Sequence, residues 1–142
     1  MSRVTRPPYV DQATNKSYDT NNPSIEGWMS KQSKWFKNWR RRYFVLKDSK
    51  LFFAKNETCA PHGMIDLSTC MTVKSAELKA GRKNSIEVST ADTTFYMFTD
   101  KEKEKDEWIG AIGRAIVQAS GTFTHEDNMD PDNMNSDSSD DE

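Results

Sequence analysis

Seven short strand-like segments, followed by one stretch of helical periodicity, limit the folds open to this chain of 142 residues. The segments are short and rich in β-branched and aromatic residues, and turn or loop residues separate them. They cover residues 26–32, 39–47, 51–55, 64–67, 71–75, 85–89 and 93–99. Seven short strands at near-regular spacing predict a mainly β domain in the form of a small sandwich or barrel.

The pattern changes after Thr99. Four apolar residues then recur at helical spacing: Trp108, Ile112, Ala115 and Ala119. This spacing predicts an amphipathic helix of about 18 residues that begins near Lys101. Since such a helix is not stable alone in water, we expect its apolar stripe to close one open end of the β structure, with Trp108 as a core anchor.

Charge is divided unevenly along the chain. Residues 1–24 hold three cations and two acids, residues 25–120 hold 17 and 12, and residues 121–142 hold none and eight, which gives net charges of +1, +5 and −8. We expect a flexible leader over residues 1–24, a folded basic domain over residues 25–120 and a disordered acidic tail over residues 121–142. The basic domain favours an anionic partner. The tail either aids solubility or competes with that partner.

Several function classes lack support in the sequence. No apolar run approaches the ~18 to 20 residues of a membrane span, and the N-terminus has no hydrophobic signal core, so we expect a soluble intracellular protein. Cys59 and Cys70 lack metal-ligand spacing and are expected to be reduced thiols. Only His62 and His125 are histidines, and no Gly-rich phosphate loop is present. We therefore predict neither enzymatic activity nor a metal or cofactor.

The stretch of residues 31–55 interleaves nine Lys or Arg residues with aromatic residues and contains one acid, Asp48. If residues 39–46 form a strand, Arg40 and Arg42 share a face with Phe44 and Leu46, while Arg41 points to the opposite face. One face is then apolar at one end and cationic at the other. Because a buried face avoids guanidinium groups unless an anion meets them, this arrangement suggests the mouth of a phosphate pocket.

The loop before this strand carries an aromatic pair between cations. Trp35 and Phe36 are flanked by Lys34 and Lys37. Aromatic rings favour the headgroup boundary of a membrane, and lysines favour anionic lipid, so the pattern of Lys34, Trp35 and Phe36 is typical of a membrane-insertion loop. The alternative is that the loop folds back and packs the pair.

Taken together, these segments resemble a pleckstrin homology (PH) domain over residues 25–120. The resemblance rests on EGWMSKQ, WRRRYFVLKDSKLFFAK, PHGMIDL and the final DKEKEKDEWIGAIGRAI, in this order. It is strongest to the small plant proteins made of a single PH domain. The resemblance implies a seven-stranded, partly open barrel of two sheets capped by one C-terminal α-helix.

The resemblance also implies a phosphoinositide site. In many PH domains a Lys near the end of the first strand and a basic-x-Arg pair on the second bind the headgroup, and nearby loops add contacts. The matching positions are Lys31, Lys37, Arg40, Arg42, Phe53 and His62. Phe53 stands where tight binders of polyphosphorylated headgroups often carry Tyr, and His62 replaces an expected Arg, so one hydroxyl donor and one permanent charge are missing.

These features favour a monomeric phosphoinositide-binding module, a lipid sensor or adaptor on the cytosolic face of the plasma membrane or an endosome. Two alternatives remain open at this point. The basic strand residues could be solvated surface charges on a protein-interaction PH domain that binds anionic lipid only weakly and without specificity. Nucleic-acid binding is disfavoured because no nucleic-acid motif is present and the acidic tail would compete with phosphates.

Overall fold

The computed structural model describes residues 5–33 and 38–120. The strands are β1 (Tyr9–Val10), β2 (Ser17–Tyr18), β3 (Ile25–Gln32), β4 (Trp39–Lys47), β5 (Lys50–Ala54), β6 (Gly63–Asp66), β7 (Cys70–Ser75), β8 (Ser85–Thr90) and β9 (Thr94–Phe98). The helices are the 3₁₀-helix η1 (Leu67–Thr69), α1 (Glu77–Ala80) and α2 (Glu102–Ser120). The seven predicted strands correspond to β3 through β9, with every end within one residue of its predicted place.

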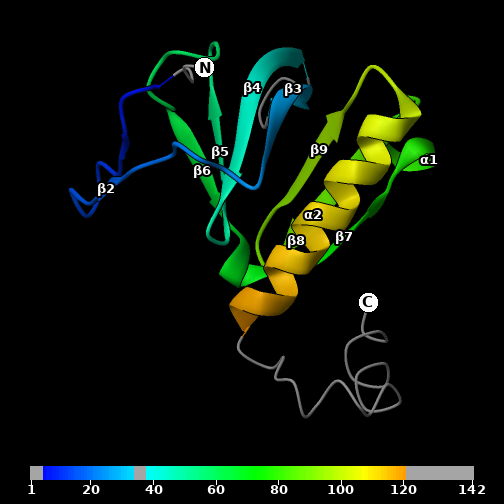
Figure 1. Cartoon of the computed structure of the whole chain (residues 1–142). Coiled ribbons are helices and arrows are strands. Elements are labelled where there is room, and N and C mark those ends of the chain that lie inside the picture. The colour runs from blue at the N-terminus through cyan, green and yellow to red at the C-terminus, as the bar shows by residue number, and fades with distance from the viewer. Residues whose placement is uncertain (1–4, 34–37, 121–142) are drawn as a thin grey trace.

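Strands β3 to β9 form one antiparallel sheet in the order β6-β5-β4-β3-β9-β8-β7. The sheet is not closed, because β6 and β7 are its two edges. Helix α2 packs against β7, β8 and η1 and covers the open side (Figure 1). The mainly β fold of a partly open barrel capped by a C-terminal helix, predicted from the sequence, is therefore confirmed.

One apolar core joins the inner faces of both halves of the sheet to the helix. Met29 and Phe44 from the first half meet Ile86 and Met97 from the second half, and all four are fully buried. Trp108 of α2 is 3% exposed and packs edge-on against Phe44, with ring centroids 6.4 Å apart. Its predicted place as the core anchor of the helix is confirmed.

A second apolar cluster lies on the outer face of β4 and β5. Tyr43, Val45 and Phe52 point away from the main core and are nevertheless buried. The cover is the short hairpin of β1 and β2, whose Tyr9 and Tyr18 lie 5.5 Å and 6.1 Å from the Phe52 ring centroid (Figure 1, blue). Strand β4 is thus buried on both faces, which explains its unbroken apolar run from Tyr43 onward.

Residues 5–24 therefore differ from the flexible leader that the sequence suggests. Arg6 fixes this segment to the barrel, and its side chain is 2% exposed. Its guanidinium donates to the carbonyls of Thr20 and Glu57, each at 2.9 Å, and to the Glu26 carboxylate at 2.6 Å. The guanidinium also lies 5.7 Å from the Tyr43 ring centroid. A buried cation with partners on three separate segments holds the hairpin in one place.

Candidate functional site

A small basic cleft lies where β3 ends and β4 begins. It has a volume of about 110 Å³ and is lined by Lys31, Ser33, Arg40, Arg42, Phe53 and His62. Five of the six predicted phosphoinositide contacts thus come together around one hollow. The sixth, Lys37, and the predicted insertion residues Lys34, Trp35 and Phe36 lie outside the described residues.

The register of the strands explains this convergence. Lys31 of β3 is directly opposite Arg40 of β4, and Met29 is opposite Arg42. Side chains alternate between faces, so Arg40 and Arg42 lie on the same face of β4 as the core residue Phe44. Arg41 points to the outer face, where it stacks 5.2 Å from the Trp28 ring centroid and approaches Asp100 at 3.5 Å. The predicted division of the three arginines between the two faces matches the structure.

Phe53 forms the apolar wall of the basic cleft. The Lys31 ammonium lies 5.0 Å from the Phe53 ring centroid, and the His62 ring meets Phe53 edge-on at 5.3 Å. A backbone hydrogen bond fixes the contact between His62 and Phe53, because the His62 amide donates to the Phe53 carbonyl at 3.0 Å. Phe53 therefore orients a lysine and a histidine toward the same hollow.

The charged residues that line the basic cleft are all positive among the described residues. Lys31, Arg40 and Arg42 contribute three positive charges, and no acidic residue is among its described lining residues. Burial against Phe53 and the nearby charges of Arg42, Lys55 and Lys31 lower the pKa of His62 below its ordinary value of 6.5. The imidazole is therefore neutral at pH 7. The positive charges that would attract an anion also oppose its protonation.

Gly63 makes room for Phe53. A Cβ atom at Gly63 would overlap the Phe53 ring, whereas one at Gly27 of β3 would meet nothing within 4 Å. We expect Gly63→Ala to push Phe53 out of place and to lower the free energy of unfolding by about 1 to 3 kcal/mol. Gly27→Ala should change it by less than ~0.5 kcal/mol. Urea unfolding of both variants checks this, and equal stability would show that the Phe53 ring yields at no cost.

Sequence reasoning missed Ser33 as a lining residue. It follows β3 directly and lies two positions after Lys31, so strand alternation places both on one face. Strand alternation could have placed Ser33 in the site, but Ser33 was assigned to the loop before residue 39. Lys55 is not among the predicted site residues, although its charge helps to lower the pKa of His62.

Cysteine and metal-ligand chemistry suggests no further site among the described residues. Cys59 and Cys70 are free thiols, and burial together with the charge of Asp66 raises the pKa of Cys70 to about 11. The described residues contain no group of three or more His, Cys, Asp or Glu side chains able to hold a metal ion. In the same part of the chain, no helix has the length and apolar character needed to cross a membrane.

Comparisons with known proteins agree with this architecture. A family model described as "PH domain" matches residues 23–117. The chain is 42% identical over 117 residues to "Pleckstrin homology domain-containing protein 1" of Arabidopsis thaliana, a match that covers 78% of this chain and 81% of that protein. It is 36% identical over 98 residues to a PH domain-containing protein of Dictyostelium discoideum, covering 68% of this chain and 21% of that protein.

Among solved structures, the chain is similar to the C-terminal PH domain of pleckstrin in complex with D-myo-Ins(1,2,3,4,5)P5. The two share 31% sequence identity with a TM-score of 0.54, and the match covers 65% of this chain and 96% of the other. The residues that the family model matches include β3, β4 and most of α2, the elements that carry the basic cleft and close the barrel.

Proposed function

The chain belongs to the PH domain family, and from this premise we propose that it binds phosphoinositide headgroups through the basic cleft and so attaches to anionic membrane surfaces. The observation that carries the proposal is the convergence of Lys31, Arg40 and Arg42 on one hollow that no described acid lines. Three cations held on neighbouring strands lose little side-chain freedom when a phosphate binds. Arginine also matches the oxygen geometry of a phosphate with two parallel hydrogen bonds.

The ligand class is supported by chemistry and by similarity. A phosphomonoester offers two negative charges and several acceptor oxygens, which suit a cleft whose donors are a lysine and two arginines. The related pleckstrin domain was captured with an inositol pentakisphosphate. In this chain the missing Tyr hydroxyl at Phe53 and the neutral His62 favour a headgroup with fewer phosphates over the most highly charged ones.

Membrane attachment would follow from the place of the cleft beside the β3–β4 loop. That loop contains Lys34, Trp35 and Phe36, which we propose insert at the headgroup boundary while the cleft holds a phosphate. The cytosolic face of the plasma membrane or of endosomes presents such lipids to a peripheral protein. The protein would act there as a lipid sensor or adaptor.

A vesicle panel tests the proposal. Binding of the full chain is measured to vesicles with mono-, bis- or trisphosphorylated phosphoinositides, and to phosphatidylserine vesicles of matched surface charge, at two salt concentrations. We expect one phosphoinositide class to bind more tightly than phosphatidylserine at both salt concentrations. Equal binding to all anionic vesicles that disappears at high salt would indicate mere charge attraction and favour the protein-interaction alternative.

The lowered pKa of His62 predicts a pH dependence. A bound phosphate offsets the charges of Arg42, Lys55 and Lys31, so the pKa of His62 is higher in the complex than in the free protein. Affinity should therefore rise as the pH falls from 7.5 to 5.5, with most of the gain below pH 6.5. The control variant is His62→Ala. With this variant the lipid phosphate still titrates, but residue 62 does not. Identical profiles for the two proteins would place the pH response in the lipid.

A further inference from the structure

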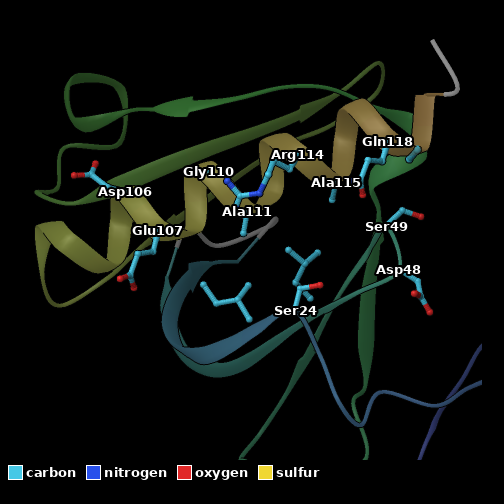
Figure 2. Close-up of a pocket in the computed structure, with 13 residues that line it drawn as sticks. Ser24, Asp48, Ser49, Asp106, Glu107, Gly110, Ala111, Arg114, Ala115 and Gln118 are labelled. Atoms are coloured by element: carbon cyan, nitrogen blue, oxygen red, sulfur yellow. The ribbon is translucent and has the colours of Figure 1, made fainter. Parts of the chain in front are cut away.

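A groove of about 820 Å³ runs along one side of α2, far from the basic cleft. We call it the helix groove. Its floor contains Ile25 at the start of β3, Leu46 near the end of β4, and Ala111 and Ala115 of α2. Figure 2 shows the helix lying across the strands, with Ala111 and Ala115 on the side of the helix that faces them. The volume is within the range of ligand-binding pockets.

The groove exists because α2 carries small residues on this side. Its large apolar residues, Trp108 and Ile112, point into the main core. Gly110, Ala111 and Ala115 face the hairpin of β3 and β4, and they are too short to fill the gap. Among the described elements, the helix packs mainly on β7, β8 and η1, and the groove lies between its other flank and the strands β3 and β4.

Charge gives the groove a preference for a cation. Asp106 and Glu107 lie at one end and Asp48 at the other, with Arg114 between them. None of the ion pairs among the described residues includes Asp48, Glu107 or Arg114. Asp106 pairs with Lys105 at 4.0 Å, so Glu107 at one end and Asp48 at the other are the carboxylates that make the rim of the apolar floor acidic.

From this arrangement we infer that the helix groove binds a segment of a partner protein with basic residues at its ends and small or apolar residues between them. The lining of α2 extends from Asp106 to Ala119, which corresponds to ~20 Å of helix and to about six residues of an extended chain. A segment of this kind would place its apolar side chains on the floor and its ammonium or guanidinium groups beside the carboxylates. The acidic rim disfavours the chain's own acidic residues 121–142 and an anionic membrane.

The helix groove does not depend on the basic cleft. Ile25 and Lys31 are six residues apart on β3, so the two sites are about 20 Å apart along the strand. The inference therefore goes beyond lipid binding and can be tested without vesicles.

The probe is a fluorescein-labelled peptide of eight residues, with two lysines at each end and leucine alternating with alanine between them. Its binding to the full chain is measured by fluorescence anisotropy, and the contacted backbone amides are located by NMR. We expect saturable binding and shifts at Gly110, Ala111 and Leu46. The double variant Asp106→Lys with Glu107→Lys should weaken binding at least tenfold, because it reverses the charge at one end of the groove. Both residues are exposed.

Two further variants distinguish binding in the groove from general charge attraction. Gly110→Leu should abolish binding by filling the groove, and it should fold well because leucine is the better helix former and the nearest atom to a new Cβ is the Arg114 guanidinium at 3.4 Å. Glu102→Lys reverses an exposed acid of α2 that does not line the groove, and binding should change less than twofold.

Four outcomes would overturn the inference. One is equal binding of a peptide with glutamate in place of lysine. Another is binding that the rim reversal leaves unchanged. Shifts of the groove amides by a peptide of residues 121–142 would make the chain's own tail the occupant. Concentration-dependent shifts of the same amides without peptide would make it a second copy of the chain.

Discussion

Replacing Arg42 by alanine is expected to weaken binding to the soluble inositol phosphate headgroup by about 10- to 100-fold. Arg42 lies on the inner face of β4 and lines the basic cleft. Its Nη1 donates to the Arg41 carbonyl at 2.8 Å, which holds the guanidinium at the mouth of the cleft. A charge-assisted hydrogen bond contributes about 1.5 to 3 kcal/mol, so losing Arg42 removes at least one order of magnitude in affinity. Isothermal titration calorimetry measures the change.

Arg41→Ala is the matched control, since it removes the same group from the next residue. Arg41 belongs to the outer face, where Trp28 and Asp100 are its partners. Its loss should weaken headgroup binding less than about threefold, through long-range charge alone. Equal losses for the two variants would show that the ligand does not distinguish the faces of β4, and the cleft would not be the binding site.

The second large effect concerns stability. Arg6→Ala should lower the free energy of unfolding by about 2 to 4 kcal/mol and the melting temperature by about 10 °C or more. The substitution removes the guanidinium that donates to the carbonyl of Thr20 and pairs with the carboxylate of Glu26, and it removes a cation from the face of Tyr43. Glu26 remains one-third exposed, so the loss should stay below that of a fully buried ion pair. Urea unfolding followed by tryptophan fluorescence gives the value.

Lys16→Ala provides the comparison in the same hairpin. Lys16 lies 5.8 Å from the Tyr18 ring centroid and is exposed, so its removal should change the stability by less than ~0.5 kcal/mol. If Arg6→Ala were as stable as Lys16→Ala, the hairpin of β1 and β2 would not contribute to the folded barrel in solution.

Much of the fold could be predicted because the strand signal is local. The apolar and aromatic run of residues 39–47 and the helical spacing from Trp108 to Ala119 depend on neighbours in sequence. The site followed from the same periodicity, since alternation along β4 separates Arg40 and Arg42 from Arg41. Lys31 joined them through the family resemblance, and the register of β3 and β4 then placed it opposite Arg40.

The parts that could not be predicted depend on contacts between distant residues. Arg6 donates to the carbonyl of Glu57, which is 51 positions away in sequence. The polar residues around Arg6 form no pattern that predicts this contact. Strands β1 and β2 are two residues long, too short for any periodic pattern. Likewise, the gap beside Gly110 depends on how α2 lies over the hairpin, which residue spacing alone does not specify.

The docked hairpin has a practical consequence for the way this domain is delimited. The stretch that family similarity recognises begins at residue 23, yet the cluster that contains Val45 and Phe52 is covered by Tyr9 and Tyr18, which precede it. Homology and cooperative folding therefore mark different boundaries in this chain. A fragment cut at residue 23 would expose Tyr43, Val45 and Phe52 as a contiguous apolar surface. Such a surface adheres to membranes and to other chains. Vesicle binding measured on that fragment would therefore include adhesion of the newly exposed surface as well as binding in the cleft.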